Sequence, residues 1–529
     1  MNKSFCLKCH ALVPSHRVER DGKVYLVKDC PECGRTEALV SSDAARHFLK
    51  RELDPGAERP PCSDVQCDTC RAHHPPRYAF VDVTNRCNMN CPMCADGVRS
   101  HGFVFEPPMD YFKAIFDHLS QFEPKPTIAL FGGEPTVRDD LIDIIKLARS
   151  YGFNTRVLTN GIRMADPDYC AKLVGTHAHL LVSYDGGNRE AYARLRGSDK
   201  FFEKKQQAIA NIRRQPRGRI SYVTCLAWGM NDDRLPEILD FCLPQHPMLH
   251  GIYLMPLVQT WKPDEFDYIP ERMTTEDVER MLAACFPDYD VQFIPLGVAS
   301  EITTLTSLFD RDPFPYHGTH PNCESLYVLI SDGEKYLPVD HFLRTNLPGF
   351  AKAFLDLEFK VRERQARWEK SLVGRILGAL RLKRFVLRVF ALGGLLWRVL
   401  RYVRLGRIVK GWGPAKLYHL SAFLFKKLIL RKKSREARRG HLNVLDALRV
   451  VILPLEDDPI LETDRLRRCP STHVTYNPKT GEFNYVPVCS WRLHNKRILR
   501  EIADAYAELG EKPLVEPAAG ATAPLATGS

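Results

Sequence analysis

The sequence lacks two features that would place a protein across a membrane or outside the cell. Its 529 residues contain no stretch of 18 or more apolar residues, so we expect no ordinary transmembrane helix. The opening residues, MNKSFCLKCH, include no apolar segment of the kind found in signal peptides, so we expect a cytoplasmic protein. Disulfide bonds are then not expected among its 17 cysteines, and clustered cysteines indicate metal ligands instead.

Acidic residues are nearly absent from one long segment. Between Ser371 and Gly440 there are 19 Lys or Arg residues and a single acid, Glu436. The net charge of the whole chain is +11, so the rest of the chain is mildly acidic. The length is enough for two to four domains, and 44% apolar residues are enough for an ordinary core.

Three cysteines stand in the stretch VDVTNRCNMNCPMCAD, with the spacing C-x3-C-x2-C. They are Cys87, Cys91 and Cys94. Three thiolates can hold three irons of a cubane [4Fe–4S] cluster and leave the fourth iron open for a substrate or cofactor. A zinc knuckle is the alternative, but the spacing is unusual for zinc and a strand-like run, Tyr78 to Val83, leads directly into the motif.

Four cysteines near the N-terminus form two C-x2-C knuckles. Between the knuckles lies a hairpin-like run that turns at Asp21-Gly22. Two knuckles offer four thiolates to one tetrahedral ion, which is either Zn²⁺ or a mononuclear, rubredoxin-like iron. The ligands expected for this site are Cys6, Cys9, Cys30 and Cys33.

Three further cysteines lie within one nine-residue stretch, which precedes the main motif in the sequence. Cys62, Cys67 and Cys70 suggest a second cluster, for which His73, His74 or a distant residue would be the fourth ligand. Structural zinc or unligated thiols are the alternative.

From Tyr78 to about Pro256, short strand-like runs alternate with helical stretches. This alternation predicts a parallel sheet of six βαβ units, a partial barrel in which loops at the carboxyl ends of the strands build the active site. The predicted strands are Tyr78–Thr84, Thr127–Phe131, Thr155–Leu158, Leu180–Ser183, Ile220–Leu226 and Gly251–Met255.

Polar and glycine residues follow three of these strands. The loop after the second strand is Gly132-Gly133-Glu134-Pro135, in which the glycines let the backbone approach a ligand closely and the carboxylate can accept a hydrogen bond from an amino group. A tight turn without a ligand is the alternative. Asn160 and Ser183 are similarly placed after the third and fourth strands.

Together, the three cysteines, the GGEP loop and the six-unit pattern resemble the radical S-adenosylmethionine (radical SAM) superfamily. The resemblance implies that the open iron binds S-adenosylmethionine and that the reduced cluster, fed by a ferredoxin- or flavodoxin-type donor, generates a 5′-deoxyadenosyl radical. It also implies that Gly133 and Glu134 hold the methionyl amino group of S-adenosylmethionine. Ser183 would then contact the ribose of this cofactor, and Met93 would pack near its adenine. Gly132, Pro135 and Asn160 complete the expected cofactor-binding set.

A narrower resemblance is to the tetraether lipid synthase-like group, which also includes proteins described as pterin methyltransferases. It rests on the N-terminal knuckles, the motif TNRCNMNCPMC, and later Cys323, Cys469 and Cys489. The last two flank a predicted hairpin, THVTYNPKTGEFNYVPV, and with Cys323 they would bind another [4Fe–4S] cluster. Unligated core thiols are the alternative.

Each expected auxiliary cluster is one ligand short. Related proteins tend to carry a cysteine where this chain has Arg77-Tyr78, and another where it has Pro470. The resemblance therefore leaves both fourth ligands unassigned.

The basic segment, residues 371–433, interleaves cations with Leu, Val, Phe and Trp. This pattern is typical of a helix that lies on an anionic membrane surface, and Gly393-Gly394 is expected to divide it in two. A solvated helix packed on the body of the protein is the alternative. Nucleic-acid binding is not expected, because the cations alternate with bulky aliphatic residues.

We therefore expect an α/β protein with a partial (βα)6 radical SAM barrel that couples lipid alkyl or acyl chains, as a peripheral protein on the inner membrane face. The alternatives are methyl transfer or another modification of a soluble, pterin-like heterocycle or peptide, and a non-catalytic metal-binding membrane adaptor. The expected regions are a four-cysteine knuckle domain (1–45), a cysteine-rich linker (46–76), the radical SAM core (77–300), a C-terminal auxiliary-cluster region (301–350 and 441–512), a basic amphipathic helical insertion (351–440) and a disordered tail (513–529).

Overall fold

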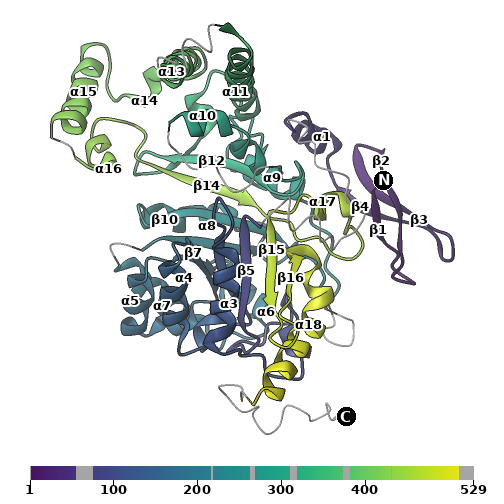
Figure 1. Ribbon diagram of the computed structural model, residues 1–529. Helices are drawn as coiled ribbons and strands as arrows, with labels where there is room; N and C mark the ends of the chain where they lie inside the picture. The colour runs from purple at the N-terminus through teal and green to yellow at the C-terminus, as the bar shows by residue number, and fades with distance from the viewer. Residues whose placement is uncertain are drawn as a thin grey trace.

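The structure is a computed structural model that describes residues 2–54, 76–215, 218–261, 268–309, 318–372, 382–430 and 432–510. Its strands form a small N-terminal sheet and one large sheet (Figure 1). The small sheet contains β1 (Lys3–Phe5), β2 (Leu12–Arg20), β3 (Lys23–Cys30) and β4 (Gly34–Ser41). The large sheet contains β5 (Tyr78–Thr84), β6 (Thr127–Gly132), β7 (Thr155–Thr159), β8 (His179–Ser183), β9 (Ile220–Leu226), β10 (Leu249–Pro256), β11 (Ile294–Pro295), β12 (Ser325–Ser331), β13 (Tyr336–Pro338), β14 (Asp446–Ile452), β15 (Ser471–Tyr476) and β16 (Phe483–Pro487).

The centre of the large sheet is the predicted six-strand array. Strands β5 to β10 pair in sequence order, and every pair is parallel. Their residues are largely buried because helices cover the sheet, as in other parallel sheets. The α/β fold predicted from the sequence is confirmed, and each predicted strand lies within two residues of an observed one.

Two C-terminal segments extend this sheet at its edges. On one side β14 pairs in parallel with β10, and β12 pairs with β14 in the antiparallel direction. On the other side β15 pairs in parallel with β5 and forms an antiparallel hairpin with β16. The hairpin predicted between Cys469 and Cys489 is therefore confirmed, and its pairing, with Thr472 opposite Pro487, brings the chain before β15 close to the chain after β16.

The helices begin and end at residues with clear capping roles. For example, α5 begins after Asp166, whose side chain accepts hydrogen bonds from two backbone amides, and α6 ends at Gly197 in the left-handed region. The helices are α1 (Ala44–Glu52), α3 (Met109–Leu119), α4 (Leu141–Ser150), α5 (Pro167–Gly175), α6 (Arg189–Arg196), α7 (Phe202–Arg213), α8 (Leu235–Cys242), α9 (Thr275–Ala284), α10 (Thr303–Leu308), α11 (Leu347–Glu369), α13 (Lys383–Tyr402), α14 (Leu405–Ile408), α15 (Pro414–Leu424), α16 (Ser434–Arg438), α17 (Thr463–Leu466) and α18 (Val488–Glu508).

The small N-terminal sheet is tied to the body by buried polar contacts. Asn2 Nδ2 donates to Glu462 Oε2 at 2.6 Å, and Lys28 Nζ donates to the Asp458 carbonyl at 3.2 Å. In the following helix, Lys50 Nζ lies 2.7 Å from Glu276 and 2.8 Å from Glu279. Because one buried cation faces two buried carboxylates, removing it would leave them only the longer contacts, both 3.8 Å, with Arg46 and His47.

The basic segment is an insertion in the large sheet. Strands β12 and β14 pair directly, with Ser331 opposite Asp446, so the chain between them leaves the sheet and returns to it. Helices α11 and α13 to α16 stand at the top of the molecule (Figure 1). None of the helices in the described residues is long and apolar enough to cross a membrane.

Gly393-Gly394 does not divide the helix, contrary to the expectation. Helix α13 continues through both glycines from Lys383 to Tyr402. A Cβ at residue 394 would lie 2.5 Å from Leu357 Cδ1, so Gly394 allows α13 to pack closely on α11.

Candidate functional site

The three cysteines of the main motif lie in the loop that follows β5. Cys87 is exposed, and Cys91 and Cys94 are partly exposed. The strand end that leads into the loop is fixed by an ion pair: Arg86 Nη2 and Nε contact the two oxygens of Glu106, at 2.9 and 2.5 Å. Three thiols are thus presented at the carboxyl end of the first core strand, which is where active sites of such sheets lie.

Backbone hydrogen bonds join the GGEP loop to the residues that lead into the cysteine loop. The Gly133 amide donates to the Thr84 carbonyl and the Glu134 amide to the Arg86 carbonyl, both at 2.8 Å. A Cβ on Gly132 would lie 2.2 Å from the Thr84 oxygen, and one on Gly133 would lie 2.3 Å from the Arg86 oxygen. The glycines therefore permit a close approach to the chain just before Cys87, and their predicted approach to a ligand stays a prediction.

Glu134 is buried and connects β6 to the end of β7. Its Oε1 accepts hydrogen bonds from Thr136 Oγ1 and Thr159 Oγ1, both at 2.6 Å, and from the Thr136 amide at 3.1 Å. Within the described part of the chain, its Oε2 accepts a hydrogen bond from the Asn160 amide alone, at 2.6 Å. A carboxylate oxygen has two lone pairs, so Oε2 keeps room for one more donor. The expected contact with an amino group stays a prediction.

Asn160 and Ser183 both lie beside the cysteine loop or its supports. Asn160 Nδ2 donates to Asn88 Oδ1 at 2.7 Å, and Asn88 stands between Cys87 and Cys91. Ser183 Oγ accepts a hydrogen bond from Lys205 Nζ at 3.0 Å, and Lys205 also contacts the Asn160 carbonyl. The three polar groups predicted after three different strands are therefore linked by hydrogen bonds, directly or through Lys205.

Lys205 is a buried lysine that sequence reasoning missed. It lies on α7, in the run FEKKQQAIANIR, where nothing distinguishes it from its exposed neighbour Lys204. Burial, followed by the nearby Arg196, lowers the pKa of Lys205 to about 7. Asp185 holds Arg196 in place, with Nε donating to Oδ2 at 2.8 Å. Only the packing of α7 over the ends of β7 and β8 reveals its position.

Met93 contributes to an apolar wall beside the third cysteine. It packs with a cluster that includes Leu195, Leu257 and Trp261. Thr260 Oγ1 donates to the Cys94 carbonyl at 3.2 Å, so the same segment that carries Trp261 also holds the end of the cysteine loop. An apolar surface is therefore present at the position where adenine packing was predicted.

The four N-terminal cysteines converge. The Sγ atoms of Cys6, Cys9, Cys30 and Cys33 all lie within 4.8 Å of one another. Backbone amides of Cys9 and Lys8 lower the pKa of the Cys6 thiol to about 6, which favours the thiolate that a metal needs. Among the described residues, no other group of His, Cys and acidic side chains comes this close together.

Cys323, Cys469 and Cys489 meet beside the C-terminal hairpin. Burial raises the pKa of the Cys323 thiol, Arg465 opposes this shift, and Cys469 and Cys489 lie close enough to add to it. Among the described residues these three thiols do not form a group as compact as the N-terminal site.

Two buried carboxylates beside these thiols have oxygens that accept no hydrogen bond from the described residues. Glu456 is 2% exposed and neither of its oxygens accepts a hydrogen bond, although Arg465 Nε lies 2.9 Å from Oε1. Glu324 Oε2 is also unpartnered. Burial raises the pKa of Cys489 to about 12, and the next cause is Glu456. Buried polar atoms of this kind usually have partners, so they indicate room for a bound group.

Cys62, Cys67 and Cys70, together with His73 and His74, lie outside the described residues. The second auxiliary cluster that they suggested stays a prediction.

Two family models match the chain. The radical SAM superfamily matches residues 81–242, and the "HMPTM N-terminal zinc ribbon domain" matches residues 1–42. A relative from Methanocaldococcus jannaschii, named 7,8-dihydro-6-hydroxymethylpterin dimethyltransferase, is 30% identical over 357 residues, which are 64% of this chain and 70% of the relative. The chain belongs to the radical SAM superfamily. The name of the relative agrees with the methyltransferase side of the narrower resemblance.

Solved structures resemble the chain less closely. Methylornithine synthase is 14% identical to this chain. The match covers 49% of this chain and 73% of the synthase chain, with a TM-score of 0.34. A radical SAM methyltransferase from Sphaerobacter thermophilus is 13% identical and covers 53% and 75%, with a TM-score of 0.31. At TM-scores this low, the likeness bears neither on the reaction nor on the substrate.

The residues present fit the groups that this superfamily implies. Three thiols on one braced loop match the ligand set of a [4Fe–4S] cluster with an open iron, and four converging thiols match a zinc ribbon site. The sequence prediction of a radical SAM enzyme that binds a [4Fe–4S] cluster and S-adenosylmethionine is confirmed at this level. The predicted lipid substrate and membrane location are not part of what the comparisons describe.

Proposed function

We propose that this radical SAM enzyme transfers methyl groups from S-adenosylmethionine, which leaves as S-adenosylhomocysteine, to a carbon of a reduced pterin or of a similar heterocycle. The observation that supports the proposal most is the 30% identity with the pterin dimethyltransferase over 70% of that protein's length. The sequence-based prediction gave this reaction as the alternative to lipid coupling, and we now prefer it to lipid coupling.

In this proposal Cys87, Cys91 and Cys94 hold the cluster, which with S-adenosylmethionine supplies a radical able to remove hydrogen from unactivated carbon. The chain's own residues bind and orient. Glu134 Oε2 is the expected acceptor for the cofactor amino group, and Ser183, held by Lys205, is expected beside the ribose. Met93 and its apolar neighbours exclude water from the adenine side.

The Cys323, Cys469 and Cys489 group is the proposed auxiliary [4Fe–4S] site. Glu456 is the best candidate for its unassigned fourth ligand, because it is buried beside these thiols and, although Oε1 faces Arg465, its Oε2 has no partner among the described residues. Carboxylate is a rarer iron–sulfur ligand than thiolate, but it carries the same negative charge. Reduced ferredoxin or flavodoxin remains the proposed electron donor.

The test uses full-length protein, reconstituted with iron and sulfide without oxygen, together with S-adenosylmethionine, a reductant and a hydroxymethyl-dihydropterin. We expect 5′-deoxyadenosine and a pterin heavier by one or two methyl groups, both measured by mass spectrometry. Cys91→Ala should abolish both products. Cys170→Ala, which changes an isolated buried thiol on α5, should retain them. Release of 5′-deoxyadenosine with no methylated heterocycle would contradict the methyltransferase proposal.

Coupling of lipid chains is the second candidate, and one observation favours it. The inserted helices expose a large apolar and basic surface, which a soluble pterin does not require. Mass spectrometry of host lipids with and without the protein separates the candidates, because coupling yields species of doubled chain length. A non-catalytic adaptor would release no 5′-deoxyadenosine in either experiment.

A further inference from the structure

Helix α13 carries an apolar stripe that faces away from the protein. Its members recur every three or four residues, so they lie on one side of the helix. They are 43–63% exposed: Leu382, Phe385, Val389, Leu392, Leu396 and Leu400. Twenty residues at 1.5 Å each give this helix a length of about 30 Å.

The opposite side of α13 already has its packing partners. Leu387 and Ala391 are buried in a cluster with Leu305, Leu357 and Val361 of α10 and α11. Arg398 Nη2 donates to Asp356 Oδ2 at 2.6 Å, which anchors the C-terminal half of the helix. Helix α13 therefore has two apolar faces. One packs on α10 and α11, and the other is the exposed stripe.

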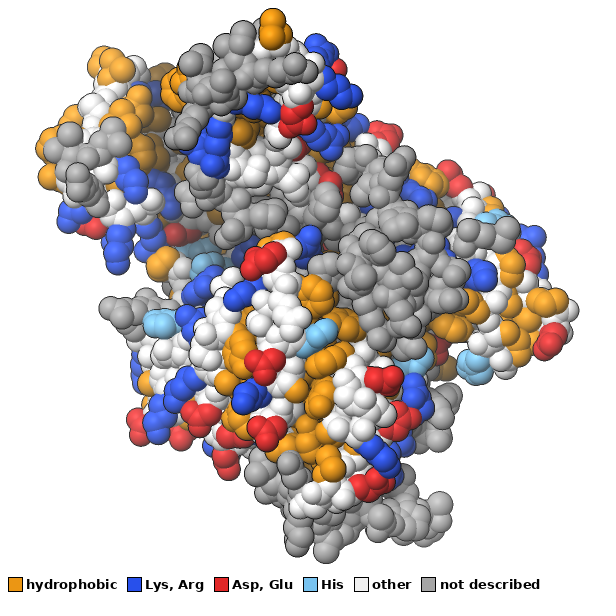
Figure 2. All heavy atoms as spheres, in the orientation of Figure 1, with side chains coloured by type: hydrophobic (Ala, Val, Ile, Leu, Met, Phe, Trp, Pro, Cys, Tyr) orange, Lys and Arg blue, Asp and Glu red, His pale blue; other side chains and the backbone are white. Residues whose placement is uncertain are grey.

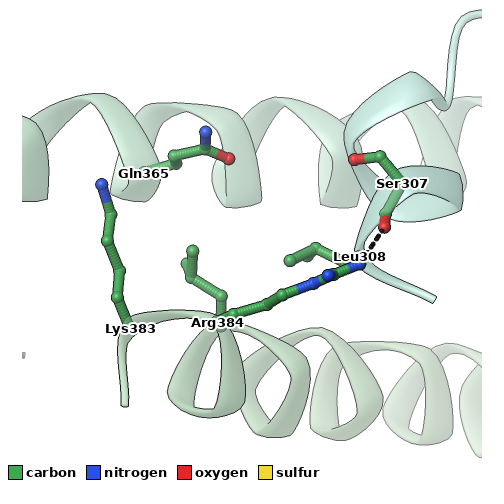
Figure 3. Close-up of a pocket in the computed structure, with 6 residues that line it drawn as sticks. Ser307, Leu308, Gln365, Lys383 and Arg384 are labelled. Atoms are coloured by element: carbon green, nitrogen blue, oxygen red, sulfur yellow. Dashed lines mark hydrogen bonds between the residues drawn. The ribbon is translucent and has the colours of Figure 1, made fainter. Parts of the chain in front are cut away.

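At the N-terminal end of α13, two cations point toward the body. They border a pocket of about 410 Å³ between α10, α11 and α13, where Lys383 faces Gln365 and Arg384 Nη2 donates to the Ser307 carbonyl at 2.9 Å (Figure 3). These contacts fix the helix on the protein with its apolar stripe outward.

Helix α15 adds to the same kind of surface. No residue of α15 is buried, and Leu417 and Tyr418 are 71% and 64% exposed. Just before it, Trp412 is 91% exposed. Figure 2 shows hydrophobic side chains gathered over this helix, with Lys and Arg side chains beside them. Soluble monomers rarely leave large apolar patches open to water unless they bind something.

The charges on this surface have one sign. From Lys370 to Arg435 the sequence contains no Asp or Glu. Among the described residues, Arg401, Lys416, Lys426 and Lys433 make no ion pair. We propose that α13, Trp412 and α15 form a docking surface for an anionic lipid bilayer, on which α13 lies flat with its apolar stripe among the acyl chains. This inference does not depend on which reaction the enzyme catalyses.

A lipid surface fits better than a second copy of the chain. A symmetric dimer through this face would bring the same cations together from both protomers, with no acid in the segment to neutralise them. Anionic headgroups neutralise them, and exposed Trp and Tyr suit the boundary between headgroups and acyl chains.

The experiment is vesicle co-sedimentation of the full-length protein with phosphatidylcholine vesicles, with and without phosphatidylglycerol. We expect binding to the anionic vesicles, weakened by high salt, and much weaker binding to neutral ones. The double variant Leu392→Asp/Leu396→Asp should lower the affinity at least tenfold, because it places two charges among the acyl chains. Leu509→Asp is a matched control, since Leu509 is 60% exposed at the end of α18 and Leu396 is 61% exposed.

Three outcomes overturn the proposal. The first is an absence of binding to anionic vesicles, and the second is equal binding by the double variant and the control. The third is a concentration-dependent dimer in analytical ultracentrifugation that Leu392→Asp/Leu396→Asp dissociates, because a second copy would then cover the stripe. Circular dichroism and the zinc content of each variant confirm that it is folded.

Discussion

Gly133 lies directly against the carbonyl group of Arg86, so close that a Cβ at residue 133 would be 2.3 Å from the oxygen. The contact joins the GGEP loop to the residue that precedes Cys87. The two sequence motifs that define the site are therefore one packed unit, in which the conformation of one loop depends on the other.

The first prediction follows from this contact. Gly133→Ala should displace the cysteine loop, because the clash involves backbone that no side-chain rotation relieves. We expect a loss of about 1–3 kcal/mol in the free energy of unfolding, as for other overpacked sites, and a lower iron content after reconstitution. Urea unfolding and iron analysis measure the two effects.

Gly175→Ala is the control for this change. Gly175 ends α5, has no atom within 4 Å of its Cβ position and does not adopt a positive φ. It should keep wild-type iron content and stability. Equal iron content in both alanine variants would show that the GGEP loop does not position the cysteines.

The second prediction concerns the pH dependence of stability. Burial lowers the pKa of Lys205 to about 7, from an ordinary value of 10.5. Between these values the unfolded chain binds a proton that the folded chain does not, so the contribution of Lys205 to stability rises with pH through this window. Below about pH 7 both states are protonated and the burial cost is fully present.

We therefore expect Lys205→Met to remove part of the gain in stability between about pH 7 and about pH 9. The expected difference is on the order of 1–2 kcal/mol, since one pKa unit corresponds to about 1.4 kcal/mol. Denaturant unfolding at the two pH values measures it. Lys204→Met, on the exposed face of the same helix, should leave the wild-type slope unchanged, and an unchanged slope in Lys205→Met would contradict the assignment.

The core of the fold was predictable because its signals are local. Strands such as Ile220–Leu226 are buried apolar runs bounded by turns, and the cysteine spacings are read within a few residues. The hairpin that ends at Pro487 was equally local, since its turn residues lie between two β-branched and aromatic runs.

What was not predictable depends on contacts between distant segments. Gly394 was expected to help divide a helix. Its actual role, close packing against Leu357, depends on a residue of another helix and is not visible in the local sequence. Lys205 gave no signal, because its burial comes from how α7 lies over the sheet. The pairing of β12 with β14 spans the whole insertion, and Glu456 stands out only once its missing partners are known.

The third prediction tests Glu456 as a metal ligand. Burial raises the pKa of this carboxyl to about 8, so without a metal it is largely protonated at neutral pH and Glu456→Gln resembles it closely. If Glu456 is a ligand, the variant should lose iron from the Cys323 site, as Cys489→Ala should. If it is not a ligand, the variant should keep its iron and be at least as stable as the wild type. Iron analysis and electron paramagnetic resonance of the reduced protein distinguish these results.

The fourth prediction concerns the zinc ribbon and its link to the C-terminal site. The buried cluster at the metal site consists of Val13 and the proposed ligands Cys6 and Cys30, with Cys33 packed against them, so we expect the metal to hold this part of the ribbon together. A strong chelator, or Cys30→Ser, should remove about one metal ion per chain and expose strands β2 to β4 to trypsin, while the large sheet stays resistant. Cys285→Ser, outside every proposed site, should keep the metal.

The effect should extend beyond the ribbon. Lys28 of β3 donates to the Asp458 carbonyl, and Asn2 contacts Glu462, so the ribbon holds the segment that carries Glu456. Loss of the ribbon metal should therefore also lower iron occupancy at Cys323, Cys469 and Cys489, with little change at Cys87, Cys91 and Cys94, where none of these contacts reaches. Metal analysis paired with limited proteolysis and mass spectrometry measures both effects. Unchanged protease sensitivity after the ribbon metal is removed would mean that the ribbon folds without it.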